Sequence, residues 1–429
     1  MDSQKFSLFS ALFIVFVVGF IVREFKLFPY QVYAEAAKGF ESIRDSAVNK
    51  LPWYHPPIKR PLPDIANNSS EITPGLTLVT RVGKEKQLLV DIVDLQGNIV
   101  HQWNVDWFEL WPDAKHIPEK DIPREQPGTH IHGAVVMENG DLIFNFENLG
   151  LIRLNRDSEV VWRLPYMTHH SLHRHDDGNL WVSGRKNHNK RIPRLPHLRP
   201  PFYEDTILVV SPEGEILKEW YIADILQENG YEGVTYLGTL NHDSVLNGIT
   251  DLFHLNDVEP FSNRFEEGFF TQGDVLVSLR NINTVFVFNS ETNKIKYISI
   301  GQFIRQHDPD FIDGNTFSVF DNNNNNTGFK RELRQSRIVM VSAKEDRHQV
   351  YFEGTAKKPF FSLIMGKHQW LPNGNLLITD SMSGRGFEIN QEKEIIWQYV
   401  NYVDEGVAGI VQQVDRLPIE YNQVFPTSE

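Results

Sequence analysis

Short apolar runs separated by turn residues cover most of the chain after residue 72. Each run is bounded by pairs such as Gly-Asn or Gly-Asp, as in Gly140-Asp141 ahead of Leu142-Ile143-Phe144. Apolar runs of this length with such boundaries predict β-strands. No helical period long enough to cross between parallel strands interrupts them, so the pattern predicts an all-β domain.

Two short patterns recur at intervals of a few dozen residues. The first is a histidine followed by a turn and an apolar strand: His132 before Gly140-Asp141, His170 before Gly178-Asn179, His307 before Gly314-Asn315 and His368 before Gly374-Asn375. The second is an aliphatic pair that leads to a tryptophan, at Trp103, Trp162, Trp220 and Trp397. Repeats of this kind are typical of β-propellers. We therefore expect a six-bladed β-propeller over residues 72–429, with histidines near its axis and tryptophans between its blades.

The first 28 residues read as a membrane anchor. Phe6 to Val22 is an apolar run without a charge, and Arg23 follows it. A helix over this run is slightly short for a hydrocarbon core of about 30 Å, and residues through Phe28 would extend it. An uncleaved N-terminal transmembrane helix is the prediction. A cleaved signal peptide is the alternative, although the small-residue triplet at 34–36 lies far beyond the run.

Residues 29–71 are expected to link this anchor to the propeller. Apolar residues at three- and four-residue spacing predict an amphipathic helix, and they are Val32, Ala36, Phe40, Ile43, Ala47 and Leu51. Pro52 to Pro63 holds six prolines and predicts an extended spacer. The organisation is therefore an anchor at 1–28, a helix and Pro-rich spacer at 29–71, and a propeller at 72–429.

Composition narrows the classes of function. A chain of 429 residues with 41% apolar residues can bury a large core. Its formal net charge of −14 argues against broad nucleic-acid binding, which requires a basic face. The absence of cysteine excludes thiolate catalysis, disulfides and cysteine-bound zinc.

The chemistry of the chain is concentrated in histidine-containing segments at the starts of the predicted blades. Thr168-His169-His170-Ser171 begins one blade, and Gln306-His307-Asp308 begins another. Histidine can act as a nucleophile, a general acid or base, or a metal ligand near neutral pH. Core packing does not require several imidazoles at one place, so the repeat predicts a functional site on the axis.

Five segments, in order, resemble the successive signatures of the arylsulfate sulfotransferase family. They are Asp251-Leu252-Phe253-His254-Leu255-Asn256, Val277-Ser278-Leu279-Arg280, Gln306-His307, Ser318-Val319-Phe320-Asp321-Asn322 and Ser336-Arg337. The resemblance spans about Gly128 to Trp397. It implies an exported six-bladed propeller that moves a sulfuryl group from an aryl sulfate to a phenol through a sulfated histidine, without the nucleotide donor PAPS or another cofactor.

The resemblance also implies roles for individual residues. His307 takes the place of the nucleophile, His254 and Arg280 that of the anion-binding pair, and His170 that of the remaining histidine of the motif, with His169 as a close competitor. His169, His368 and Arg337 are further candidates for substrate binding. The large domain is expected outside the cytoplasm, on the periplasmic or extracellular side of a single-pass membrane protein.

The chain also departs from the family, and other functions stay open. Residues 260–268 are an extra segment, and the anchor, helix and spacer replace the family's N-terminal β-domain. His130-Ile131-His132 could chelate a metal and supports a metal-dependent hydrolase as an alternative. A catalytically silent propeller that binds a partner in a membrane assembly, or an oligomer, is another. Asp321 followed by five asparagines is a solvated loop or a structural calcium site.

Overall fold

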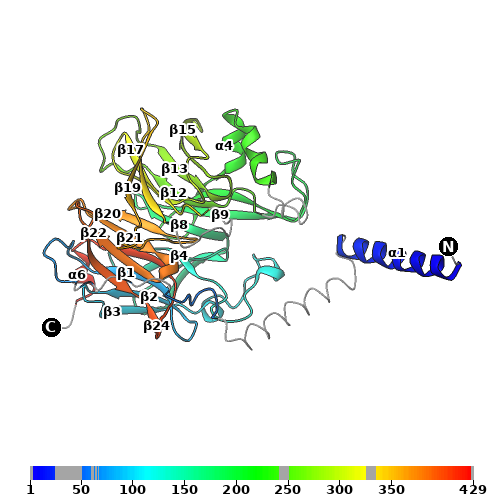
Figure 1. Ribbon diagram of the computed structural model, residues 1–429. Coiled ribbons are helices and arrows are strands. Elements are labelled where there is room, and N and C mark those ends of the chain that lie inside the picture. Colours follow the sequence, from blue (N-terminus) through cyan, green and yellow to red (C-terminus); the bar gives the residue numbers. More distant parts are fainter. Residues whose placement is uncertain are drawn as a thin grey trace. The chain divides into compact units, whose positions relative to one another are not determined.

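The computed structural model describes residues 3–24, 51–58, 62, 65, 67–240, 251–324 and 335–426. The chain divides into two compact units, Met1–Trp53 and Tyr54–Glu429 (Figure 1). The first unit holds helix α1 (Ser3–Glu24). No helix in the described residues is long and apolar enough to cross a membrane.

The predicted transmembrane helix therefore has no support from the structure, and the predicted location outside the cytoplasm stays a prediction. The amphipathic helix falls almost wholly on residues 25–50, outside the described part of the chain. Part of the predicted spacer belongs to the second unit, where Pro57 bridges to Val407 and the N–H of Ile58 donates to the oxygen of Gly406 at 2.9 Å.

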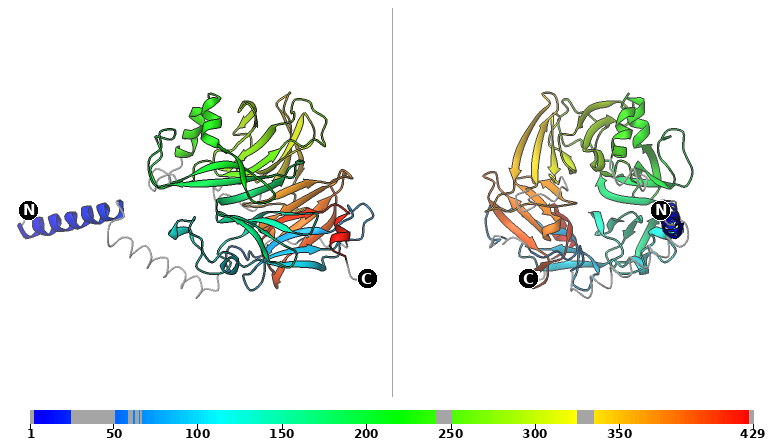
Figure 2. Two further views of the ribbon diagram at one scale, coloured as in Figure 1. Left: turned by 180° about the vertical axis from the view of Figure 1, so that it is seen from behind. Right: turned by 45° about the vertical axis from the view of Figure 1, so that its right-hand side comes forward.

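The second unit is a six-bladed propeller, as predicted, built in its described residues from six four-stranded antiparallel sheets. The right-hand view of Figure 2 shows the sheets around a common centre. Blade 2 is β4 (Ile131–Val136), β5 (Leu142–Phe146), β6 (Gly150–Leu154) and β7 (Val160–Leu164). Blade 3 is β8 (Met167–Arg174), β9 (Leu180–His188), β10 (Phe202–Val210) and β11 (Ile216–Tyr221). Blade 4 is β12 (Leu255–Pro260), β13 (Asp274–Leu279), β14 (Thr284–Asn289) and β15 (Ile295–Ile300).

The remaining blades follow the same order, with one exception. Blade 5 is β16 (His307–Phe311), β17 (Thr316–Asp321), β18 (Arg337–Ser342) and β19 (Arg347–Glu353). Blade 6 is β20 (Lys367–Trp370), β21 (Leu376–Asp380), β22 (Arg385–Ile389) and β23 (Ile395–Val400). Blade 1 joins β1 (Thr77–Val82), β2 (Leu88–Val93) and β3 (Ile99–Asn104) to the C-terminal strand β26 (Val411–Arg416). The contribution of β26 to blade 1 was not predicted.

Several short elements lie outside the six four-stranded sheets. They are the helices α3 (Trp107–Leu110), α4 (Ile222–Glu228) and α6 (Tyr421–Val424), the 3₁₀ turns η1 (Glu119–Asp121), η2 (Glu232–Leu240), η3 (Arg280–Ile282) and η5 (Ser381–Ser383), and the pair β24 (Tyr402–Asp404) and β25 (Val407–Ala408). The inner strands are mostly buried, whereas the outer strands alternate or face solvent. The inner strands that line the axis are β4, β8, β12, β16, β20 and β26.

Each of the four repeated tryptophans contacts the blade that follows its own, as predicted. Each indole N–H donates to the turn between the last two strands of the following blade: Trp103 to Asn155 O at 3.1 Å, Trp162 to Pro212 O at 2.9 Å, Trp220 to Asn293 Oδ1 at 3.1 Å and Trp397 to Leu95 O at 2.8 Å. Trp103 and Trp397 are completely buried. The contact from Trp397 to Leu95 joins blade 6 to blade 1.

Candidate active site

The inner strands of blades 2 to 5 all begin with a break in register. The shifts lie between Ile131 and Ala134, His169 and Leu172, Leu255 and Asp257, and His307 and Asp310. Such bulges bend a strand and change the direction of its side chains. His170 and His254 also have φ values of +52° and +55°, a left-handed backbone that residues other than glycine seldom adopt. The same distortion therefore places a histidine at the start of each of these strands.

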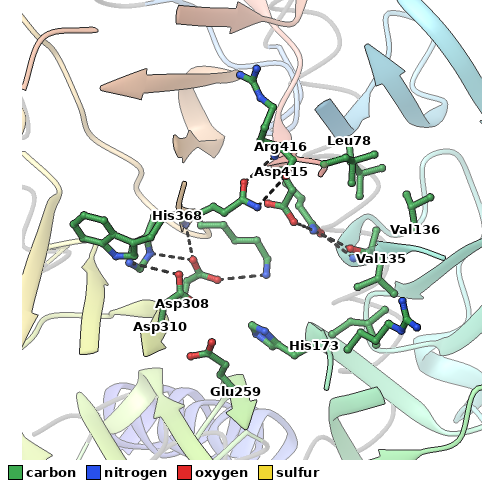
Figure 3. A pocket seen from close by; sticks show the side chains of 18 of the residues that line it. Leu78, Val135, Val136, His173, Glu259, Asp308, Asp310, His368, Asp415 and Arg416 are labelled. Carbon is green, nitrogen blue, oxygen red and sulfur yellow. Dashed lines mark hydrogen bonds and ion pairs between the residues drawn. The ribbon is translucent and has the colours of Figure 1, made fainter. Parts of the chain in front are cut away.

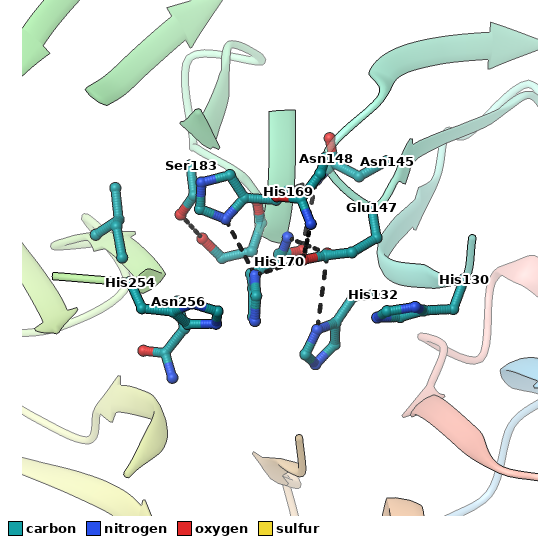
Figure 4. Close-up of polar contacts among 12 residues, drawn as sticks. His130, His132, Asn145, Glu147, Asn148, His169, His170, Ser183, His254 and Asn256 are labelled. Carbon is teal, nitrogen blue, oxygen red and sulfur yellow. Dashed lines mark hydrogen bonds and ion pairs between the residues drawn. The ribbon is translucent and has the colours of Figure 1, made fainter. Parts of the chain in front are cut away.

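Four imidazoles from four successive blades meet at this end of the axis, and we call His132, His170, His254 and His307 the histidine cluster. The ring of His170 lies 4.4 Å from that of His132, 4.8 Å from that of His254 and 6.1 Å from that of His307, between centroids. Figure 4 shows three of these rings side by side. The structure thus brings together three histidines of the repeat, His132, His170 and His307, with His254, for which the family resemblance implies a role.

His307 presents one ring nitrogen to the cluster in a fixed tautomer. Its Nδ1 lies 2.7 Å from Asn322 Oδ1 and 3.1 Å from the carbonyl oxygen of Arg305. The amide nitrogen of Asn322 donates to the oxygens of Ser362 and Met365, so its Oδ1 faces the imidazole. Both neighbours of Nδ1 are acceptors, so Nδ1 carries the proton and Nε2 keeps its lone pair. Nε2 is buried and has no hydrogen-bond partner among the described residues.

His254 has the same arrangement with a carboxylate. Its Nδ1 makes a hydrogen bond to the carboxylate of Asp251, and its buried Nε2 has no partner in the described part of the chain. Burial opposes the ionisation of Asp251, but His254 and Arg280 hold the pKa of this carboxyl below its usual value. An anionic Asp251 therefore orients the ring of His254 by accepting the hydrogen bond of its Nδ1.

Arg280 places a half-buried cation next to His254. Its backbone N–H donates to the oxygen of His254 at 3.1 Å, and its guanidinium contacts Asn281 Oδ1 at 3.2 Å through Nη2. Burial lowers the pKa of Arg280 to about 10, so it stays charged at neutral pH. Burial, and after it the charge of Arg280, lower the pKa of His307 to about 3. The imidazole of His307 is therefore neutral and nucleophilic at neutral pH.

A buried carboxylate, Glu147, lies among the remaining imidazoles, and we call His130, His132, Glu147, His169 and His170 the Glu147 cluster (Figure 4). Glu147 Oε1 is 3.0 Å from His170 Nδ1, and its Oε2 is 3.9 Å from His132 Nδ1 and accepts the N–H of His170 at 2.9 Å. His169 Nδ1 is 3.0 Å from His170 Nδ1. These side chains form one connected group next to His307.

Burial controls the charge of this group. It lowers the pKa of His169 to about 4 and the pKa values of His132 and His170 well below the usual value. Burial opposes the ionisation of Glu147, but the surrounding histidines and the N–H of His170 lower its pKa to about 2. One carboxylate surrounded by neutral imidazoles is the state expected at neutral pH.

The opposite ends of the inner strands line a separate cavity of about 390 Å³ (Figure 3). His173, Glu259, Asp308 and Asp310 face it, each further along its strand than the cluster histidine. His368 belongs to this cavity, where its Nε2 lies 2.6 Å from Ser318 Oγ and its Nδ1 lies 3.1 Å from Asp308 Oδ2.

Two of the residues predicted to bind substrate therefore lie apart from the histidine cluster. His368 is held in the second cavity because its strand, β20, starts at Lys367 without the bulge found in blades 2 to 5. Arg337 donates from Nε and Nη2 to Asp321 Oδ2 at 2.9 and 2.7 Å. His169, in contrast, lies within the Glu147 cluster, and His170, His254, Arg280 and His307 all lie at the site.

Three sets of side chains in the described residues could each hold a metal ion, with one ligand atom per residue and all ligand atoms within 4.8 Å. They are His130, His132 and Glu147; Glu147, His169 and His170; and Asp308, Asp310 and His368. The pair His130 and His132 can therefore chelate, as strand alternation predicts.

Glu147 was missed by the sequence analysis, and Asp251 and Asn322 were read as parts of a motif without a role. Glu147, Arg280 and Asn322 share one position, directly after the second strand of their blades, β5, β13 and β17. The end of that strand faces the start of the inner strand because the two are antiparallel. A polar residue immediately after the second strand of a blade is therefore the sequence signal that marks Glu147, Arg280 and Asn322.

Comparison with known proteins shows which family the chain resembles. The family model for arylsulfotransferases (ASST) matches residues 133–402. No curated protein matches the chain.

Similar solved structures were also found. A protein of unknown function from Bacteroides caccae is 14% identical, with a TM-score of 0.49 over 80% of this chain and 98% of that one. Virginiamycin B lyase from Staphylococcus aureus is 15% identical, with a TM-score of 0.35 over 63% of this chain and 70% of that one. Likenesses at this level carry no conclusion about chemistry.

Proposed function

This chain belongs to the arylsulfotransferase family, and from that premise we propose that it moves a sulfuryl group from an aryl sulfate to a phenol through a sulfated His307. The observation that carries the proposal is the buried Nε2 of His307, which has no partner in the described residues and holds its lone pair because Asn322 and Arg305 both accept from Nδ1. A neutral imidazole with one free nitrogen is a competent nucleophile.

In the first half-reaction, the lone pair on His307 Nε2 forms a bond to sulfur while the bond between sulfur and the aryl oxygen breaks. The electron pair of the broken bond leaves with the phenolate. His254, oriented by Asp251, is the group that protonates this oxygen through its open Nε2. The products are a phenol and a sulfuryl group on a histidine whose Nδ1 proton remains hydrogen-bonded to Asn322.

In the second half-reaction, the acceptor phenol attacks sulfur and the bond between sulfur and Nε2 breaks, which restores neutral His307. His254, now unprotonated, takes the proton of the acceptor, so the two half-reactions balance without a nucleotide. In this proposal Arg280 binds the sulfate oxygens, because its half-buried guanidinium offers several donors in a fixed plane. His170 lies between His254 and His132 and completes the wall of the site.

The decisive experiment compares wild type with His307→Asn. Asparagine keeps a hydrogen-bonding side chain of similar reach but has no nucleophilic nitrogen, so folding should survive and turnover of an aryl sulfate with excess phenol should fall by at least about 10³-fold. Intact-mass measurement after addition of donor alone should show one sulfuryl adduct on wild type and none on the variant. His368→Asn is the matched control, since it removes a buried histidine of the same repeat outside the cluster.

Two results would count against the proposal. One is an adduct or full turnover in His307→Asn, which would assign the nucleophile elsewhere. The other is the absence of adduct and of turnover in folded wild type across a panel of aryl sulfates, which would favour the silent propeller. The assay contains neither nucleotide nor added metal, so activity under these conditions also separates sulfuryl transfer from a metal-dependent hydrolase.

A further inference from the structure

We propose that the Glu147 cluster binds a divalent transition-metal ion through His130, His132 and Glu147. Two imidazoles and one carboxylate form the ligand set: His130 directly precedes β4, His132 lies in it, and Glu147 directly follows β5. Imidazole and carboxylate ligands suit ions such as Zn²⁺ and Co²⁺, and three protein ligands leave a coordination position for a substrate atom. This site is independent of sulfuryl transfer by His307 and lies next to it.

The distances permit an ion to be held. Two atoms that both bind an ion at about 2.1 Å lie at most about 4.2 Å apart. His132 Nδ1 and Glu147 Oε2 are 3.9 Å apart, within this limit. The ligand atoms of the whole set lie within 4.8 Å of one another, so binding needs the side chains to move closer together around the ion.

The burial of the ligands favours the same conclusion. His132 is 2% exposed, and its Nδ1 has no hydrogen-bond partner in the described part of the chain. A buried polar atom without a partner costs free energy, and a bound ion would remove that cost. This orphaned nitrogen is the one that faces the carboxylate of Glu147.

Contacts outside the ligand set hold the carboxylate in place. The backbone N–H of His170 donates to Glu147 Oε2 at 2.9 Å, Asn148 Nδ2 donates to Oε1 at 3.2 Å, and the N–H of Glu147 donates to the oxygen of His130 at 3.0 Å. Groups behind the ligands orient them and raise metal affinity. The last of these hydrogen bonds also ties Glu147 to the strand that carries both histidines.

The other two sets are weaker candidates. In the set with His169 and His170, the two Nδ1 atoms already lie 3.0 Å apart, within hydrogen-bond distance of each other. In the set with Asp308, the carboxylate accepts the N–H of His368 and pairs with Lys367 at 3.4 Å. The Nδ1 atoms of His169 and His170 and the carboxylate of Asp308 thus already contact protein groups, whereas His132 Nδ1 has no hydrogen-bond partner in the described residues.

The test is a titration of chelator-treated, full-length protein with Co²⁺ and with Zn²⁺. Calorimetry and the visible absorption of bound Co²⁺ measure binding, and the thermal midpoint of unfolding measures the stability of the loaded protein. Wild type should bind one ion per chain and unfold at a higher temperature when it is bound. Glu147→Gln, His132→Asn and His130→Asn should each weaken binding by about 100-fold or more. His368→Asn is the matched control for the second cavity, and it should bind as wild type does.

The result distinguishes this site from the sulfuryl-transfer site, because His307→Asn should lose turnover and keep metal affinity. Absence of binding by folded wild type would overturn the proposal, as would unchanged affinity in the folded Glu147→Gln and His132→Asn variants. Loss of binding in His368→Asn alone would place the ion with Asp308 and Asp310 and would also overturn it. If a variant does not fold, the metal-dependent rise in the thermal midpoint of wild type and of His368→Asn still decides the outcome.

Discussion

Individual side chains at the axis owe their charge and tautomer to burial and to one or two fixed neighbours. His307 is neutral because it is buried beside Arg280, and Asn322 decides which of its nitrogens is free. Asp205 shows the opposite behaviour of a buried carboxyl. Burial, and next the charge of Asp251, raise the pKa of Asp205 to about 8, and its Oδ2 has no partner among the described residues.

The substitution Asp205→Asn tests whether folding keeps this carboxyl protonated. In the unfolded chain Asp205 releases its proton near its ordinary pKa of about 3.9, whereas the folded protein keeps it up to about pH 8. Between these values the folded state binds one more proton, so stability falls as pH rises, by up to about 1.4 kcal/mol per pH unit. Asparagine cannot ionise, so urea unfolding from pH 5 to 8 should show a smaller fall in the variant. Asp404→Asn, at an exposed position, should follow wild type; equal slopes in wild type and Asp205→Asn would contradict the assignment.

At the scale of elements, the start of each inner strand and the end of its neighbour build the site together. The bulges of β4 and β8 bring the backbones of two blades very close at Gly133. A Cβ atom at this position would lie 2.2 Å from the oxygen of His170 and 3.1 Å from the nitrogen of Leu172. Glycine is required because the obstructing atoms are backbone atoms of another strand, which cannot rotate away.

Gly133→Ala should therefore separate β4 from β8. We expect a loss of about 1–3 kcal/mol in the free energy of unfolding and a lower rate of sulfuryl transfer, because the rings of His132 and His170 move apart. Chemical denaturation and turnover measure the two effects. Gly233→Ala is the control, since nothing lies within 4 Å of the added carbon. A Gly133→Ala protein as stable and as active as Gly233→Ala would show that the contact is not rigid.

At the scale of the whole molecule, the ring is closed by side-chain amides that imitate backbone pairing between inner strands. Gln413 in β26 accepts the N–H of Ala134 at 2.8 Å and donates to its oxygen at 2.9 Å, which joins blade 1 to blade 2. Gln369 in β20 makes the same two bonds to the backbone of Arg416, at 2.8 and 3.1 Å. The C-terminal strand is thus attached to the blade on each side of it.

The neighbouring residues Gln412 and Gln413 give a matched test of ring closure. Gln413→Met leaves a buried N–H and a buried carbonyl of Ala134 unpaired, so the free energy of unfolding should fall by about 1–3 kcal/mol. Gln412 is completely buried, and neither of its side-chain polar atoms has a partner in the described residues. Gln412→Met should therefore be neutral or stabilising. Denaturant unfolding of both variants checks this, and equal destabilisation by the two would refute the role of Gln413.

The repeats in the sequence by themselves determined the six-bladed propeller. The turn-bounded runs predicted the blades, the repeated tryptophans predicted contacts between them, and the family motifs named His254, Arg280 and His307. These features depend on residues close together in the chain, where periodicity and turn chemistry act directly.

Tertiary structure alone decided which of these residues meet. Glu147 lies among four imidazoles because β5 runs antiparallel to β4, and β26 completes blade 1 across more than 300 residues of chain, from Thr77 to Arg416. His368 shares the repeat of His307 but not its bulge, and so it lies in the other cavity. A one-residue change in register redirects a side chain without altering the apolar pattern that predicts the strand. That is the physical reason why the strands could be read from the sequence while the composition of the site could not.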